Sequence, residues 1–343
     1  MLNNLKILKR SSIWLMFIEN IFYPLYHFFW SYIINFKGKI FYFLWLFKKK
    51  DFFSLNNNDK LIVKSTIDSK NIANKILEES KLFIDDTKKE LLSNRFSIEQ
   101  SKKNLADGEI PYRISIYEKL SENLKKEIVQ FASSDKLVTT ASEYMKVFPI
   151  LTRVQVYYNI PRENSSVRGA MFWHKDGFGF KNLDYFMCVT NVDENSGPFY
   201  CLEKKINAGI FKSFDYFFKK TGERNKVNLE NFNKKFKDDE ILEFKGASGK
   251  AIFLDSFSTF HRGGFCKDKD RIMLRFCYQT HDAIAEELES NKNYFSYDTS
   301  ITKENVKDIF QKYLFFKKPP FFLKIIKKYL IKFYYLIEYR YKI

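Results

Sequence analysis

The chain has 343 residues, four cysteines and a formal net charge of +17. That charge lies at the two ends: residues 1–50 carry eight Lys/Arg and one acid, residues 311–343 carry nine and one, and the 260 residues between them keep only +2. A nearly neutral body excludes the folded basic patch of a nucleic-acid-binding domain. Because no cysteine pair has CxxC spacing and four cysteines are few for this length, a zinc ribbon and a disulfide scaffold are excluded too, and a reducing cytoplasmic setting is favoured.

The first 50 residues contain two apolar, aromatic runs. Residues 13–36 have the length of a bilayer span, but polar residues and a proline, which are costly at mid-bilayer, interrupt the run. Residues 40–47 are too short to span a bilayer and are followed by three lysines. We predict that residues 1–50 form interfacial helices at an anionic membrane surface, with a single spanning helix as the alternative.

The last segment, residues 321–343, is basic and amphipathic. Lys324, Lys328 and Lys332 recur every four residues, while aromatic and aliphatic residues recur at steps of three and four. This pattern is typical of a helix that lies in a membrane interface, and the alternative is a terminal helix packed on the body. Together the two ends predict a cytoplasmic protein held peripherally at the inner face of a membrane.

The body begins with helical patterns and continues with strands. Residues 71–95 and 116–131 have helical periodicity, and Ser115 with Glu118 has the spacing of a capping box for the second helix. From residue 152 onward, short runs rich in β-branched and aromatic residues predict strands. These runs are residues 153–160, 171–174, 185–192, 199–202, 241–244, 250–254 and 271–278.

Many short strands behind a helical lead-in predict the fold class, a mostly β core with flanking helices arranged as a jelly roll. Between the strands, residues 205–220 predict a helix and residues 246–249 predict a turn. The predicted organisation comprises the N-terminal segment 1–50, a domain over 51–310 with its helical lead-in 51–150 and jelly-roll core 150–282, and a C-terminal helix over 311–343.

The stretch FWHKDG at residues 172–177 places a histidine and an aspartate two positions apart. On a strand, His174 and Asp176 point to the same face and can converge on one metal ion. The histidine best placed to supply a third ligand is His261, which follows a strand and precedes Arg-Gly-Gly. Two histidines and one carboxylate on one face of a metal are the arrangement of non-haem Fe(II) oxygenases. Arg271, on the next strand, is placed to hold the remote carboxylate of a 2-oxo acid, with Arg275 as the fallback.

The ordered set HKD, NSGPFYCL, GKAIFLDSFSTFHRGG and RIMLRF resembles the phytanoyl-CoA dioxygenase-like family. These proteins are Fe(II)- and 2-oxoglutarate-dependent oxygenases on a double-stranded β-helix, a cupin-like jelly roll. The resemblance covers roughly residues 150–280, less than half of the chain. It implies that His174, Asp176 and His261 ligate iron and that Arg271 binds the 5-carboxylate of 2-oxoglutarate.

The resemblance also implies that the strand before the HxD motif contributes polar contacts to the co-substrate, and we expect Gln155 and Asn159 to do so. Two departures concern the substrate side. The stretch CLEKKINAG replaces the family's Pro-Gly-Ser-His, and Gly263 stands where a serine often assists the carboxylate contact. Side chains that line the substrate side or pack in the core, with both alternatives open, are Phe178, Phe180 and Tyr185.

The implied activity is hydroxylation with dioxygen and 2-oxoglutarate, releasing succinate and CO2. The substrate is expected to be a small molecule, a lipid or a lipid-linked glycan precursor, and desaturation in place of hydroxylation stays open. The main alternative is a catalytically silent jelly-roll protein that binds or scaffolds at a membrane surface. A metal-dependent isomerase that uses no oxygen is a further alternative, which Arg271 disfavours because such chemistry has no remote carboxylate to hold.

Overall fold

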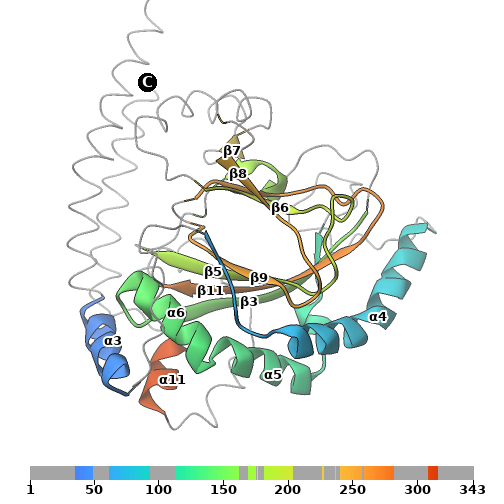
Figure 1. Cartoon of the computed structure of the whole chain (residues 1–343). Coiled ribbons are helices and arrows are strands. Elements are labelled where there is room, and N and C mark those ends of the chain that lie inside the picture. Colours follow the sequence, from blue (N-terminus) through green and yellow to red (C-terminus); the bar gives the residue numbers. More distant parts are fainter. Residues whose placement is uncertain are drawn as a thin grey trace, which may run out of the picture.

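Two antiparallel sheets face each other and form a jelly roll (Figure 1). The computed structural model describes residues 35–48, 62–92, 113–161, 169–174, 176, 181–203, 226–227, 236, 240–256, 259–281 and 308–315. The larger sheet has the order β1 (Ile62–Lys64), β9 (Ala251–Leu254), β5 (Asn182–Cys188), β11 (Arg271–Gln279), β3 (Ile150–Asn159), β2 (Arg113–Ser115). The smaller sheet has the order β7 (Lys226–Val227), β4 (Trp173–His174), β10 (His261–Gly263), β6 (Phe199–Leu202), β8 (Ile241–Phe244). This architecture confirms the predicted fold class.

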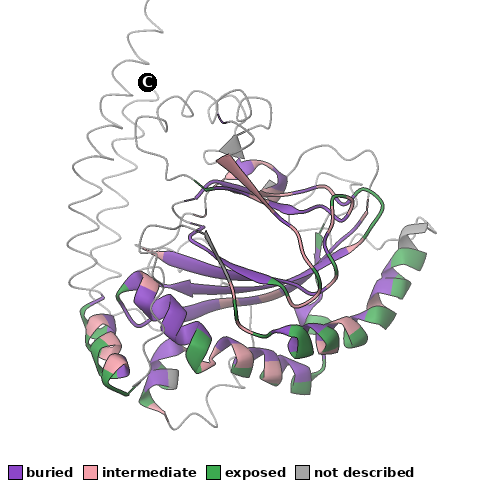
Figure 2. Ribbon diagram, in the orientation of Figure 1, coloured by how far each residue is buried: buried purple, intermediate pink, exposed green. Residues whose placement is uncertain are grey.

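Alternate residues of the large sheet serve two different cores, because successive side chains of a strand point to opposite faces. In β3 and β11, Val156 and Leu274 face outward into a cluster that the helices complete, whereas Tyr157 and Met273 face inward. The inner cluster joins the two sheets through Phe186 and Phe199. Both strands are buried along nearly their whole length, as the purple ribbons of Figure 2 show.

Three helices cover the outer face of the large sheet (Figure 1). They are α4 (Lys70–Leu92), α5 (Glu122–Ala132) and α6 (Asp135–Met145). Each places small or aliphatic residues at helical spacing against the sheet, such as Ala73 and Ile76 in α4 and Ile128 in α5, all fully buried. The helix predicted at residues 71–95 is thus confirmed as α4, while α6 was not predicted.

The predicted start of the second helix is wrong. Ser115 is the last residue of β2, and α5 begins after Ser121, whose hydroxyl accepts a hydrogen bond from the Leu124 amide at 3.2 Å. Ser121 also donates from its amide and hydroxyl to Glu79 of α4, at 2.8 and 2.7 Å. The segment around Ser115 instead pairs with the edge of the large sheet, where Ile114 is buried opposite Tyr158 of β3. A tertiary pairing therefore overrides the local capping signal.

The predicted strands appear in the structure with shifts of a few residues at their ends. The largest shift concerns residues 185–192, where the observed strand is β5 (Asn182–Cys188). At residues 171–174, Met171 instead ends a 3₁₀ turn, η4 (Gly169–Met171), and only Trp173–His174 pair as a strand. The turn at residues 246–249 connects β8 to β9 as predicted. Predictions for residues 205–220, for residues 321–343 and for most of residues 13–36 fall outside the described part of the chain.

Two further helices lie side by side at one corner of the body: α3 (Phe36–Lys48) and α11 (Ile309–Leu314). Their rings interlock, since Phe41 stacks on Tyr313 with centroids 4.5 Å apart and Trp45 meets Phe310 edge-on at 5.1 Å. His281, just after β11, joins this corner by donating its backbone amide to the Asn35 side chain at 2.9 Å. Segments from both ends of the chain therefore pack on the jelly roll at the same place.

Candidate metal centre

The three residues predicted to bind a metal converge in the small sheet. His174 of β4 and His261 of β10 are directly paired across the strands, and their ring centroids are 4.4 Å apart. Asp176 follows two residues after His174 and donates its backbone amide to the carbonyl of Ser256 at 2.9 Å. Its Oδ1 lies 3.8 Å from the Nε2 of His174, and its Oδ2 lies 3.8 Å from the Nε2 of His261.

Backbone carbonyls set the orientation of both imidazoles. The Nδ1 of His174 is 2.8 Å from the carbonyl oxygen of Phe172, and the Nδ1 of His261 is 3.1 Å from that of Thr259. Each ring therefore donates from Nδ1 to the carbonyl two residues earlier, which leaves the lone pair on Nε2. A second hydrogen bond of this kind is the usual way in which proteins orient a metal-binding histidine.

The electrostatics of the cluster favour a neutral His174 imidazole and an ionised Asp176 carboxylate. Burial, and next the neighbouring His261, lower the pKa of His174 to about 4. Burial by itself would raise the pKa of Asp176, but the guanidinium of Arg275 and the two histidines hold that pKa well below its ordinary value. At neutral pH His174 and Asp176 thus have the protonation states that a divalent ion requires.

The geometry fits one ion. Ligand bonds to a first-row divalent metal are about 2.1 Å long, so two ligand atoms on one ion can be up to about 4.2 Å apart. The two Nε2-to-carboxylate distances of 3.8 Å fall within this span. With two nitrogen ligands and one oxygen ligand from a single side of the ion, the donor set is that of the two-histidine, one-carboxylate iron sites, whose other positions stay open for exogenous ligands.

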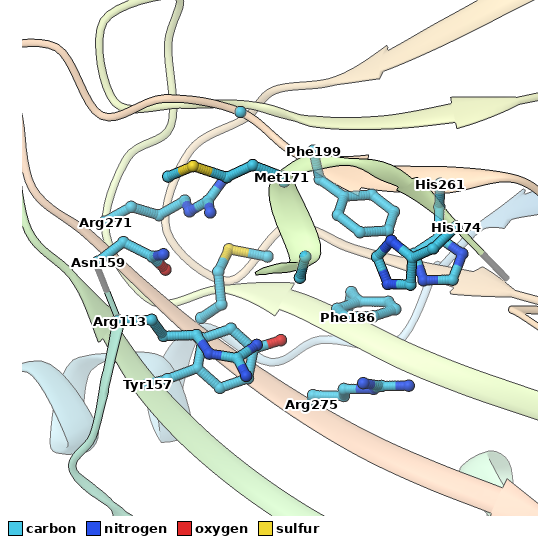
Figure 3. A pocket seen from close by; sticks show the side chains of 14 residues that line it. Arg113, Tyr157, Asn159, Met171, His174, Phe186, Phe199, His261, Arg271 and Arg275 are labelled. Carbon is cyan, nitrogen blue, oxygen red and sulfur yellow. The ribbon is translucent and has the colours of Figure 1, made fainter. Parts of the chain in front are cut away.

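The open side of the cluster faces a cavity between the two sheets. Figure 3 shows His174 and His261 at one end of this cavity and Arg271 with Asn159 at the other. Arg271 is only 4% exposed, and neither its Nε nor its Nη1 has a hydrogen-bond partner among the described residues. The Oδ1 of Asn159, directly across the β3–β11 ladder, has none either. A buried guanidinium in this state is costly unless a ligand completes its hydrogen bonds.

Not all residues predicted to contact the co-substrate line the cavity. Arg271 and Asn159 line the cavity, whereas Gln155 is not among its lining residues. The fallback residue Arg275 also reaches the cavity, but its Nη2 donates to Asp176 at 2.5 Å and to the fully buried Asp184 at 2.6 Å. Of the two arginines of β11, Arg275 therefore holds the carboxylate of the metal cluster, and Arg271 keeps a guanidinium whose Nε and Nη1 have no partner among the described residues.

Sequence reasoning missed three residues of this site. Arg113, on the edge strand β2, lies over the ring of Tyr157 at 4.9 Å, and both residues line the cavity. Burial raises the pKa of Tyr157 even though Arg275, Arg113 and Arg271 oppose the shift, so its hydroxyl remains a hydrogen-bond donor. The third is Asp184. Position on the inward side of β3 or β5 is the signal that could have found Tyr157 and Asp184.

The three aromatic residues near the HxD motif are only partly placed. Tyr185 belongs to the core and not to the cavity, because its ring stacks on Phe276 at 5.5 Å and its hydroxyl lies 2.5 Å from that of Ser69. Phe178 and Phe180 lie outside the described residues. The structure thus assigns Tyr185 to the core, and the placement of Phe178 and Phe180 stays a prediction.

Two glycine-containing segments, the NSGP turn and the Arg-Gly-Gly stretch, contact each other beside the site. The amide of Gly264 donates to the carbonyl of Pro198 at 2.8 Å, and a Cβ at Gly264 would lie only 2.4 Å from that oxygen. Gly197 has φ of +71°, and a Cβ there would lie 2.7 Å from the backbone nitrogen of Cys266. The NSGP turn and the Arg-Gly-Gly stretch are therefore in direct backbone contact, which explains why small residues stand at both.

Solved structures that match this fold share little sequence with the chain. AviO1 from Streptomyces viridochromogenes Tue57 is 9% identical, with a TM-score of 0.42, over 65% of this chain and 91% of that chain. EctD from S. alaskensis with bound Fe is 13% identical, with a TM-score of 0.42, over 72% and 85%. SnoN, a non-heme alpha ketoglutarate dependent epimerase from nogalamycin biosynthesis, is 11% identical, with a TM-score of 0.39, over 65% and 80%. At this level of similarity, the function of the site has to be argued from its own geometry.

A sequence profile described as serpentine type 7TM GPCR receptor class ab chemoreceptor matches residues 8–134. This range is less than half of the chain, so the match does not assign a family. No curated protein matches the sequence. Among the described residues, no helix has both the length and the apolar character needed to cross a membrane.

Proposed function

We propose that the protein is an Fe(II)- and 2-oxoglutarate-dependent oxygenase that hydroxylates its substrate and releases succinate and CO2. One observation carries the proposal. A single cavity has the cluster of His174, Asp176 and His261 at one end. At its other end is the buried guanidinium of Arg271, whose Nε and Nη1 have no hydrogen-bond partner among the described residues. A 2-oxo dicarboxylate has the two matching ends. Its 2-oxo acid end chelates a metal, and its remote carboxylate pairs with an arginine.

Each residue has a definite task in this proposal. His174, Asp176 and His261 hold the iron, which when bound supplies the redox chemistry with dioxygen. Arg271 holds the remote carboxylate of the co-substrate, and the Asn159 amide beside it can turn to donate a further hydrogen bond. The three apolar side chains Phe186, Phe199 and Met273 line the same cavity and exclude water from it.

The test measures co-substrate binding apart from turnover. Calorimetry of 2-oxoglutarate binding to the Mn(II)-loaded protein should show a 1:1 complex, and Arg271→Met should weaken it about a hundredfold. Arg262→Met is the matched control, because Arg262 stacks on Tyr200 at 3.9 Å and does not line the cavity. Succinate formation should require Fe(II) and 2-oxoglutarate and should disappear in His174→Ala. Metal binding without any 2-oxoglutarate binding would contradict the proposal and favour a metal enzyme that uses no such co-substrate.

We also propose that the substrate is a lipid or a lipid-linked glycan precursor. The support is the apolar wall of the cavity beside the histidines, where Phe186 and Phe199 pack with ring centroids 4.7 Å apart and Met171 lines the same space. A lipid extract should stimulate succinate formation more than the water-soluble metabolites of the same cells. Stimulation by the aqueous fraction alone would contradict this substrate class.

A further inference from the structure

Helix α3 is fixed to the body along one side. Trp45 is buried, and its Nε1 donates to the hydroxyl of Thr139 in α6 at 3.1 Å. The carbonyl of Gly38 accepts the amide of Phe148 at 2.9 Å, and a Cβ at Gly38 would lie 2.6 Å from a methyl group of Val147. This close approach determines which side of the helix faces the body and which side faces away.

The opposite side of α3 presents a stripe of large apolar residues, which we name the α3 stripe. Its members are between 44% and 71% exposed, and they are Phe36, Ile40, Phe43, Leu44 and Phe47. Their spacing of three and four residues puts them on one helical face. Seven large hydrophobic residues are exposed in the described part of the chain, and this stripe holds five of them, while a sixth, Ile309, lies on the adjacent α11. Figure 2 shows the exposed residues along this helix in green.

Positive charge surrounds the α3 stripe. The helix contains Lys37, Lys39 and Lys48 and no acidic residue. Because α3 packs on α11, the chain passes into residues 1–34 and residues 316–343 from this same corner, and these segments carry three Lys/Arg against one acid and eight against one. The only acidic side chain of α11 and its preceding residue is that of Asp308, which Lys48 neutralises at 2.7 Å.

We propose that the α3 stripe docks this protein on an anionic bilayer, inserting its aromatic residues at the level of the headgroups. Charge complementarity selects this occupant. A second copy of the chain would bring two lysine-bearing helices together, and the chain's own basic end segments would do the same. An anionic lipid surface instead attracts these lysines while it accepts the apolar side chains. This inference does not depend on the proposed enzymatic activity.

The experiment uses the full chain and sedimentation with phosphatidylcholine vesicles, with or without about a quarter phosphatidylglycerol, at about 0.15 M salt. The double variant Phe43→Glu with Phe47→Glu should partition into the anionic vesicles at least tenfold less than the parent protein. Leu82→Glu is the matched control, because Leu82 is 78% exposed on α4, away from the α3 stripe, and its partition should equal that of the parent.

A gain-of-signal variant keeps the test independent of folding. In Phe47→Trp the apolar character of the stripe is kept, and the tryptophan emission should shift to shorter wavelength when anionic vesicles are added. Equal binding of the double variant and the parent, or equal binding to neutral and anionic vesicles, would overturn the proposal. Loss of a concentration-dependent dimer in vesicle-free buffer, with vesicle binding intact, would assign the stripe to contacts between copies and would overturn it as well.

Discussion

The two faces of the large sheet are built from alternate residues of the same strands, yet they are used for opposite purposes. In β11 the outward residues Leu274 and Phe276 are completely buried against helices, whereas the inward residues Arg271 and Arg275 carry charge into the space between the sheets. The apolar face supplies packing energy, and that energy allows the other face to keep buried charges that contribute little to stability by themselves. Substitutions at neighbouring positions should therefore separate stability from chemistry.

The largest effect is expected on the outward face. Phe276→Ala should lower the free energy of unfolding by about 3–5 kcal/mol, because the fully buried ring stacks on Tyr185 and packs at 5.9 Å against Phe131, so its removal leaves a cavity. Urea unfolding measures this loss. The metal affinity of the folded protein should stay unchanged, and a weakened metal site in this variant would show that the two faces are not independent.

A somewhat smaller effect on stability, with a clear effect on the site, is expected one residue earlier. Arg275→Met should cost about 3 kcal/mol, because Asp184 is left buried without its cation. Metal affinity should fall about tenfold, since Asp176 loses the donor that fixes its carboxylate.

The double variant Arg275→Met with Asp184→Asn is the control for this prediction. It should recover most of the lost stability, because the fully buried position 184 no longer carries an uncompensated charge, and it should not recover metal affinity, because Asp176 still lacks its donor. A tighter metal site in Arg275→Met would contradict the orienting role of the guanidinium, because it would show that relief of positive charge is the larger effect.

The smallest effect on stability is expected in the small sheet, which faces the inward side of the large sheet. It compares two adjacent glycines. Gly264→Ala should cost about 1–3 kcal/mol, because its Cβ would overlap the carbonyl of Pro198. Gly263→Ala should change stability by less than about 0.5 kcal/mol, since a Cβ there lies 3.6 Å from Arg271, an ordinary contact. Thermal unfolding compares the two, and equal losses would contradict the backbone contact between the NSGP turn and the Arg-Gly-Gly stretch.

Strand positions and the metal cluster could be predicted from the sequence because their signals are local. The period of two in residues 153–160 and 271–278 reflects the pleat itself, and it correctly puts Gln155 with Asn159, and Arg271 with Arg275, on one face of their strands. The two-residue spacing of His174 and Asp176 likewise needs only the geometry of one short segment. The third member, His261, was predicted from its place after a strand and before Arg-Gly-Gly, and the structure shows it paired with His174.

Only the tertiary structure decided which of the two arginines of β11 faces the cavity unpaired, because Asp176 and Asp184, the partners of Arg275, lie 99 and 91 residues away in sequence. It also decided that α5 begins after Ser121, where Glu79 of another helix completes the cap, and that Arg113 reaches the site from an edge strand. Contacts between distant segments depend on how sheets and helices pack together, and no local spacing records that packing. The sequence by itself determined the strands, the fold class and the candidate ligands; the packing determined their partners.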